Sequence, residues 1–201
     1  MSDLLTTDRL VFNQKAKLIE LAHEFKIRDT DGREVGTIRQ EGQSTARKLA
    51  RLVSSLDQFM THTVAVVDGD GTRVVELTRP RKIVKSTVLV RDGEGRDVGK
   101  IVQRNVVGKI RFGLEDAQGT EVGAINAENW RAWNFNIRDA AGGEVARITK
   151  TWEGLAKTLF TTADDYLLEV SAPTTAVLRQ LILASAAGVD LALKQDARGL
   201  G

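Results

Sequence analysis

Five aspartates recur along the chain, each with a glycine three positions later, and their type and spacing come closest to a metal site. They are Asp29, Asp68, Asp92, Asp116 and Asp139. The stretch from Asp68 to Gly71 resembles the start of an EF-hand calcium loop, whose twelfth position carries a bidentate glutamate. That position holds Arg79 here. The pattern therefore favours tight turns, in which an aspartate bonds its own backbone and a glycine adopts a positive φ.

The rest of the composition excludes several kinds of catalytic and metal site. The chain has no cysteine and only two histidines, His23 and His62, which lie far apart. Thiolate metal sites, disulfides and cysteine nucleophiles are therefore excluded, and a zinc site or a Ser-His-Asp triad has too few histidines. No phosphate-binding glycine loop and no Gly-x-Ser-x-Gly motif occurs in the sequence. We therefore expect neither an enzyme that makes or breaks covalent bonds nor a cofactor.

The aspartates belong to a longer repeat that predicts β-hairpins. Alternating apolar residues, then Asp-x-x-Gly, then a second short apolar run return five times. In residues 110–114, for example, apolar residues alternate with polar or small ones, a period of two that places one face inward. Strands at Leu10–Asn13 and Tyr166–Ser171 flank the five hairpins. A chain of this length thus predicts one domain over 1–201, an antiparallel barrel or sandwich of about twelve strands.

Between Gln43 and Met60 the hydrophobic period changes to 3.6 residues, which predicts an inserted amphipathic helix. Its outer face carries the basic residues Arg47, Lys48 and Arg51. Two interpretations are open. The helix covers one opening of the barrel with its charges solvated, or its basic face lies against anionic lipid headgroups.

A second helix is predicted from Thr174 to Lys194, and its apolar residues surround the whole circumference. Such a helix must be buried on every side, in a bilayer or in the protein interior. Its longest stretch without Arg, Asp or Gln, Leu181–Val189, is well short of the ~20 residues that a membrane span needs. A twelve-stranded barrel would be hollow, since roughly eight strands already enclose a lumen that side chains fill. We therefore expect this helix to occupy the barrel.

Small residues stand two positions before an isoleucine in four of the repeats. They are Gly36, Gly99, Gly123 and Ala146. Two explanations are open, because such residues give clearance to a helix inside the barrel and also mark β-bulges.

Hairpin repeats followed by one hydrophobic C-terminal helix resemble the phospholipid scramblase and LURP-one-related proteins, relatives of the Tubby C-terminal domain. The likeness covers residues 10–194 and is most specific in two stretches. One is LTRPRK at Leu77–Lys82, and the other is Phe135–Tyr166, which contains Lys-x-Trp-x-Gly and Phe-Thr-x-Ala-Asp. The resemblance implies a twelve-stranded barrel wrapped around its C-terminal helix. It also implies association with phospholipid and energy-independent movement of phospholipid between leaflets.

The same resemblance implies a calcium-binding segment just before and within the last predicted strand. Asp164, Asp165 and Glu169 are the acidic residues present there. The segment departs from the family pattern at its leading acidic position, which is Thr162, and at Leu167, where a glycine is expected. Calcium takes six to eight oxygen ligands. The segment therefore predicts at most a degenerate calcium site.

The charge balance bears on the partners. With 29 basic and 27 acidic residues the net charge is +2, which permits an anionic partner without requiring one. Besides the amphipathic helix, the linker between two hairpins supplies candidate contacts to anionic phospholipid. These are Arg79, Arg81, Lys82 and Lys85. Because the N-terminus has no apolar stretch long enough for a secretion signal, we expect a cytoplasmic protein, peripheral at the inner membrane face.

Two other functions compete with a lipid-associated one. A barrel of this kind also suits a soluble scaffold or regulator, whose protein partner the sequence does not identify. Binding of nucleic acid ranks last, because aromatic residues make up only 5% of the chain and the net charge is small. We therefore expect no nucleic-acid partner.

Overall fold

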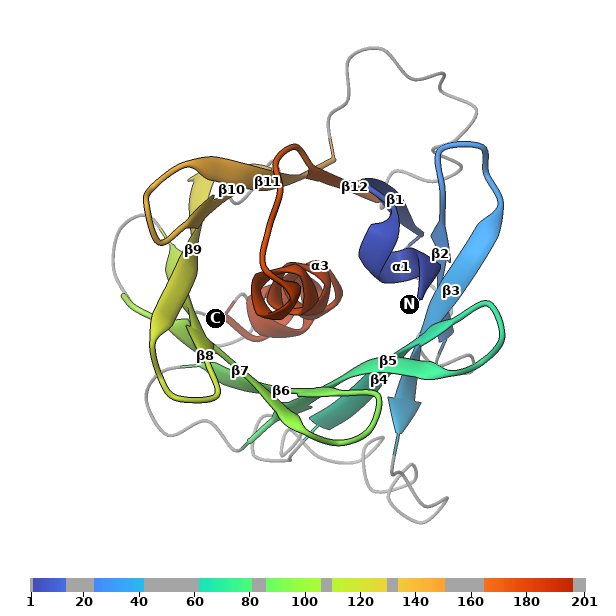
Figure 1. Ribbon diagram of the computed structural model, residues 1–201, viewed down its shortest axis with the longest axis horizontal. Coiled ribbons are helices and arrows are strands. Elements are labelled where there is room, and N and C mark those ends of the chain that lie inside the picture. Colours follow the sequence, from blue (N-terminus) through green and yellow to red (C-terminus); the bar gives the residue numbers. More distant parts are fainter. Residues whose placement is uncertain are drawn as a thin grey trace.

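Twelve strands form one closed antiparallel barrel, in which each strand pairs with its chain neighbours and β1 pairs with β12 (Figure 1). The computed structural model describes residues 2–13, 24–41, 62–80, 86–105, 110–129, 134–150 and 165–196. The strands are β1 (Arg9–Asn13), β2 (Glu24–Arg28), β3 (Glu34–Glu41), β4 (His62–Asp68), β5 (Arg73–Arg79), β6 (Thr87–Asp92), β7 (Asp97–Gln103), β8 (Arg111–Asp116), β9 (Glu121–Asn129), β10 (Asn134–Asp139), β11 (Glu144–Thr149) and β12 (Tyr166–Val170). The described helices are α1 (Asp3–Thr6) and α3 (Ala176–Asp196). The predicted mainly β fold is confirmed, and of the two all-β alternatives it is the barrel.

Each hairpin built on Asp-x-x-Gly turns in the same way. In the β4–β5 hairpin the Gly71 N–H donates to the Asp68 carbonyl at 2.9 Å, and Asp68 Oδ1 accepts the Thr72 N–H at 2.9 Å. Gly71 has a φ of +82°, in the left-handed region where a glycine meets no steric penalty. This is a β-turn closed by a left-handed glycine, a common hairpin connection. The turn role predicted for the aspartates is confirmed.

A β-bulge follows each of these turns and accounts for the small residues of the repeat. The register shifts by one residue in every hairpin; in the β6–β7 hairpin Val90 pairs with Gly99 and Arg91 with Asp97, which leaves Val98 of β7 as the extra residue. A Cβ on Gly36, Gly99 or Gly123 would lie 2.5, 2.0 or 2.6 Å from a backbone oxygen of the adjacent strand. Of these three, Gly123 would also meet α3, at 3.1 Å from Leu178 Cδ1. Close approach of the neighbouring strand beside each bulge therefore explains these glycines, and clearance for α3 contributes only at Gly123.

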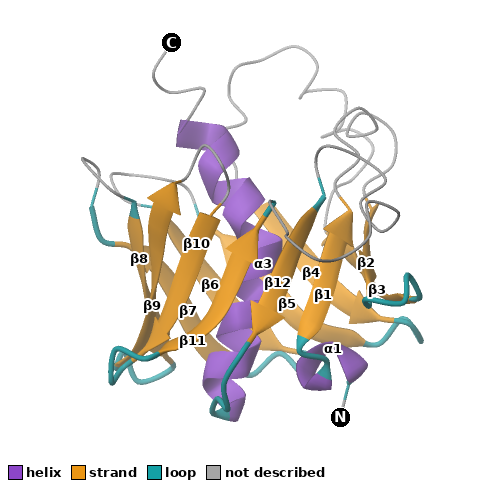
Figure 2. Cartoon of the chain, turned by 90° about the horizontal axis from the view of Figure 1, so that it is seen from above, coloured by secondary structure: helices purple, strands orange, loops and turns teal. Residues whose placement is uncertain are grey.

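The helix α3 occupies the lumen along the barrel, and α1 lies at one end (Figures 1 and 2). Residues Leu181–Ala187 of α3 are all buried. From the barrel wall, the Tyr166 hydroxyl donates to the Ala186 carbonyl at 2.7 Å, and the Tyr166 ring stacks on Phe12 with centroids 5.1 Å apart. The helix thus replaces the side chains that would fill a narrower barrel. The interior position predicted for the C-terminal helix is confirmed.

The bounds of α3 differ by two residues from the predicted range. It begins at Ala176 because Thr175 caps it, with Thr175 Oγ1 accepting the Leu178 N–H at 3.2 Å.

Over the residues that the structure describes, no helix combines the length and the apolar character needed to cross a membrane. The amphipathic helix predicted over 43–60 lies outside the described residues.

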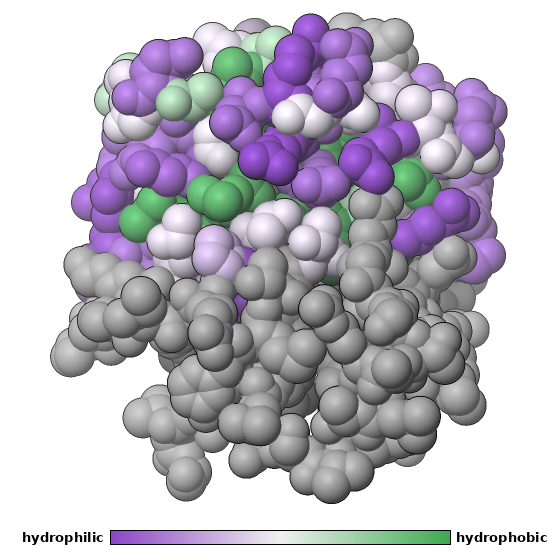
Figure 3. Space-filling view, turned by 90° about the horizontal axis from the view of Figure 1, so that it is seen from below, coloured by the Kyte–Doolittle hydropathy of each residue, from purple (hydrophilic) through white to green (hydrophobic). Residues whose placement is uncertain are grey.

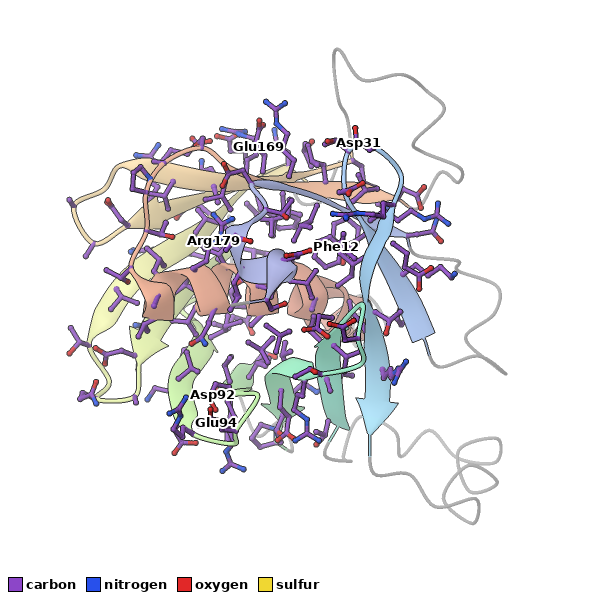
Figure 4. All side chains as sticks on the ribbon, turned by 45° about the vertical axis from the view of Figure 1, so that its right-hand side comes forward. Phe12, Asp31, Asp92, Glu94, Glu169 and Arg179 are labelled. Atoms are coloured by element: carbon purple, nitrogen blue, oxygen red, sulfur yellow. The ribbon has the colours of Figure 1, made fainter. Side chains whose placement is uncertain are left out.

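Arg179, the one cation in the first half of α3, does not face an apolar wall. It lies beside α1 (Figure 4), where it donates to the Thr7 carbonyl at 2.6 Å and to Asp8 Oδ1 at 3.2 Å. These bonds satisfy a guanidinium whose side chain is only 13% exposed. They also tie the start of α3 to the segment that leads into β1.

Candidate functional site

Polar side chains on the outer surface of β8, β9 and β10 gather around one cleft. Phe112 and Ile125 point into the core, so the alternation of strand residues turns their neighbours outward. Arg111, Asn126 and Asn136 are in register across the three strands and form one outward row.

The cleft has a volume of about 630 Å³ and extends over these strands to the turn between β10 and β11. The cleft exists because the next outward-facing row of residues has small side chains on β8 and β9. In that row Ala124 stands in register between Gly113 and Arg138. A Cβ on Gly113 would lie 2.4 Å from Nε of Arg104. The Arg104 guanidinium therefore covers that glycine, and it pairs with Glu121, which lines the cleft.

One wall of the cleft is held by ion pairs. Arg104 Nη2 contacts Glu115 Oε1 at 2.7 Å and Glu121 Oε2 at 2.5 Å, and Arg111 Nη2 donates to Glu121 Oε1 at 3.2 Å. Lys100 Nζ lies 2.9 Å from the second Glu115 oxygen. The hydrogen bond from Lys100, followed by that from Arg104, lowers the pKa of Glu115. Glu115 and Glu121 are thus both paired with cations, and of the two Glu121 lines the cleft.

The opposite wall is a chain of hydrogen bonds that ends on Glu128. Asn126 Nδ2 donates to Asn136 Oδ1 at 3.2 Å, and Asn136 Nδ2 donates to Glu128 Oε1 at 2.8 Å. Arg147 Nη1 reaches the other Glu128 oxygen at 2.8 Å. The hydrogen bond from Arg147, with that from Asn136, lowers the pKa of Glu128. This wall too is fixed by bonds among its own members.

At the turn end of the cleft, two charged groups are less committed. Arg138 Nη1 donates to the Gly142 carbonyl at 3.3 Å, and Arg138 makes no ion pair at contact distance among the described residues, although its charge adds to the lowering of the pKa of Glu128. Asp139 Oδ1 accepts the Gly143 N–H at 2.9 Å, and no described cation pairs with its carboxylate. Both residues line the cleft. A cation and an anion are therefore available to a ligand at the same end.

Elsewhere the described surface is mainly polar. Figure 3 shows one face on which hydrophilic residues predominate among the coloured atoms and hydrophobic ones form small patches. Among the described residues, Leu89 is the large hydrophobic side chain that is exposed, at 39%. The described surface therefore offers charged and polar contacts rather than one large apolar contact.

Most of the predicted lipid contacts cannot be placed on this surface. Arg47, Lys48, Arg51, Arg81, Lys82 and Lys85 lie outside the described residues. Arg79 is described: it ends β5 two residues after Leu77, a core residue, and therefore faces the same way. It is only 6% exposed, so a headgroup contact would require this side chain to emerge from the barrel end. The lipid contacts remain predictions.

The predicted calcium residues do not form a cluster in the described part of the chain. Asp165 is 2% exposed and precedes β12, whereas Glu169, four residues on, accepts a hydrogen bond from Arg9 Nε at 2.8 Å on the outer surface (Figure 4). Along a strand, four residues span roughly 13 Å, too far for one shared ion. Within the described ranges, no three His, Asp or Glu side chains could hold a metal ion. Asp164 lies outside them.

Comparison with known proteins identifies one family. The family model described as Scramblase matches residues 1–193. No curated protein and no solved structure gives a significant match. The match covers the whole barrel and α3 as far as residue 193.

Proposed function

Since the chain belongs to the scramblase family, we propose that it is a phospholipid-associated protein of the cytoplasm that binds peripherally to anionic lipid at the inner membrane face. Its action on lipid is to let phospholipid move between leaflets without an energy source, and no covalent bond is made or broken. The observation that carries this proposal is the family match over residues 1–193.

The described ion pairs make one set of surface arginines less suitable as membrane contacts. Surface arginines such as Arg9, Arg91 and Arg96 are paired with carboxylates at 2.7 to 2.9 Å, which reduces their attraction to anionic lipid. The proposed contacts are the basic residues predicted in segment 43–60 and in the linker at 81–85, which lie outside the described residues. Each basic residue near an anionic surface contributes about 1 kcal/mol, so a few of them give weak binding that salt screens.

Vesicle flotation tests the membrane contact. The protein is expected to float with vesicles containing phosphatidylserine at low salt, and to stay unbound at high salt or with phosphatidylcholine alone. The triple variant Arg81→Gln, Lys82→Gln, Lys85→Gln should weaken binding on the order of 100-fold, because three charges are removed.

A matched triple variant at Arg9, Arg91 and Arg96, each changed to Gln, removes the same charge from paired positions. It should weaken flotation far less than the linker variant. Absence of flotation at low salt, or equal loss in the two triple variants, would contradict the proposed contact.

Translocation is tested by a fluorescent-lipid assay with purified protein in vesicles and no nucleotide. At first an external quencher reaches only the labelled lipid of the outer leaflet, which is about one half of the total. We expect labelled lipid from the inner leaflet to become accessible to the quencher faster than in protein-free vesicles. The assay is run with calcium and with a chelator, since a degenerate calcium segment predicts little difference between the two. A rate equal to that of protein-free vesicles would remove translocation from the proposal.

The filled lumen favours a second candidate, a scaffold without action on lipid. Because α3 and the core residues around it occupy the barrel, the described structure provides no polar path for a headgroup through its centre. A protein that ignores vesicles of every composition but retains one defined protein partner at stoichiometric amounts would support this candidate.

A further inference from the structure

The fifth hairpin differs from the others at the residue that follows its turn glycine. In the β2–β3 and β6–β7 hairpins that residue is an arginine, whose Nε donates to the turn aspartate: Arg33 to Asp29 at 3.0 Å, and Arg96 to Asp92 at 2.7 Å. In the β10–β11 hairpin it is Gly143. No arginine therefore covers Asp139 from this position, and its carboxylate borders the cleft instead.

Arg138 also differs in its contacts from Arg91, one of the two other arginines that precede a turn aspartate. The arginine that precedes the turn aspartate in β6, Arg91, pairs with Asp97 at 2.9 Å. Arg138 instead reaches only the Gly142 carbonyl, at 3.3 Å, so most of its guanidinium donors are unused within the described part of the chain. A guanidinium with free parallel donors is suited to bind phosphate through two hydrogen bonds.

The floor of the cleft leaves room between these charges and the opposite wall. Ala124 and Gly123 contribute little or no side chain there. Asn126 lines the same cleft, and it donates through Nδ2 to Asn136, while its Oδ1 accepts no hydrogen bond from the described residues. A volume of about 630 Å³ is within the range of small-molecule sites.

We propose that this cleft binds a zwitterion in which a phosphate and an ammonium group are joined by a short linker. The phosphate pairs with Arg138, and the ammonium donates to Asp139. The inference rests on the proposed function only in taking a lipid headgroup as one source of this chemistry, since a free phosphoamine carries the same groups. A ligand of one sign fits less well, because the available charges are one cation and one anion.

Titration of isotope-labelled protein with O-phosphoethanolamine, followed by amide chemical shifts, tests the site. We expect saturable shifts at Ala124, Asn126 and the β10–β11 turn. Arg138→Gln and Asp139→Asn should each weaken binding about tenfold, the effect of losing one charged hydrogen bond. The asparagine retains the oxygen that accepts the Gly143 N–H, so the turn itself is kept.

Matched control variants come from other hairpins of the same repeat. Arg28→Gln changes the arginine that precedes Asp29, and Asp116→Asn changes the turn aspartate between β8 and β9. Neither residue lines the cleft. Both variants should bind O-phosphoethanolamine with unchanged affinity.

Ethanolamine and inorganic phosphate, added separately, should each bind at least about tenfold more weakly than O-phosphoethanolamine, because each makes half of the charged contacts. Equal binding of phosphate alone would overturn the assignment, as would shifts that do not saturate or variants that bind normally.

Vesicles of phosphatidylcholine with and without phosphatidylethanolamine distinguish a lipid source from a free one. Either source supports the site if Arg138→Gln and Asp139→Asn weaken its binding. Flotation on phosphatidylserine vesicles that persists without any binding of O-phosphoethanolamine would overturn this inference and leave the proposed function intact. Binding of O-phosphoethanolamine without flotation on phosphatidylserine vesicles would support this inference and contradict the proposed membrane contact.

Discussion

Replacing Leu181 by aspartate is expected to abolish cooperative folding of the barrel. Leu181 begins the continuous buried stretch of α3 and is 0% exposed. A carboxylate there would be surrounded by apolar side chains of the core. The cost is on the order of 5 kcal/mol or more, comparable with the whole stability of a typical domain. Circular dichroism during urea unfolding should show no cooperative transition.

Leu89→Asp provides the matched control, with the same change of residue on the outside of the barrel. Leu89 is 39% exposed on β6 and lies in register with Lys100 on β7. Its replacement should lower the free energy of unfolding by less than about 1 kcal/mol. If Leu181→Asp unfolded with the same midpoint as Leu89→Asp, α3 would not be part of the core.

The second large effect is expected for Gly99→Ala. Gly99 follows the bulge of the β6–β7 hairpin with a φ of +155°, and an added Cβ would lie 2.0 Å from the Glu115 carbonyl oxygen. That oxygen belongs to the backbone of β8, so β7 and β8 must separate before a side chain fits. The free energy of unfolding should fall by about 3 kcal/mol, from strain and lost pairing together. Urea unfolding measures it.

Gly69→Ala controls for the loss of a glycine as such. Gly69 stands in the β4–β5 turn, does not have a positive φ, and an added Cβ would lie 3.9 Å from the nearest atom, the Val35 carbonyl oxygen. Alanine there should leave stability unchanged within about 0.5 kcal/mol or raise it slightly. Similar losses in both variants would mean that the bulge does not require a glycine at position 99.

The barrel could be predicted from the sequence because its signals are local. Each Asp-x-x-Gly turn sets the pairing of the two strands beside it, and the alternation of apolar residues sets which face is inward. The position of α3 could be predicted from two sizes. A barrel of twelve strands has a lumen that must be occupied, and the uninterrupted apolar stretch of the helix is too short to span a bilayer.

The cleft could not be predicted in the same way, because it depends on register across three strands. That Ala124 stands between Gly113 and Arg138, and that Arg104 folds over Gly113, follows from bulges and pairings with no signal in any single hairpin. One sign was present in the sequence: Gly143 stands where other repeats carry Arg or Thr.

Extending the inward–outward alternation of β5 to Arg79 would have improved the prediction of the lipid contacts. The Arg-Pro pair at the end of the second full hairpin suggested a solvated linker, but β5 extends through Arg79. Since Val75 and Leu77 face the core, the period of two places Arg79 on the inward side as well. A lipid contact at this residue was therefore a weaker prediction than at the linker residues that follow it.

The proposed fold requires α3 to remain inside its own barrel, and thiol labelling measures whether it does. The chain has no cysteine, so Ser185→Cys on α3 and Ser171→Cys after β12 each introduce a single thiol. Ser185 is buried and Ser171 is exposed. With protein in buffer or bound to phosphatidylserine vesicles, we expect a water-soluble thiol reagent to modify the Ser185→Cys protein orders of magnitude more slowly than the Ser171→Cys protein. Equal rates in either condition would contradict it.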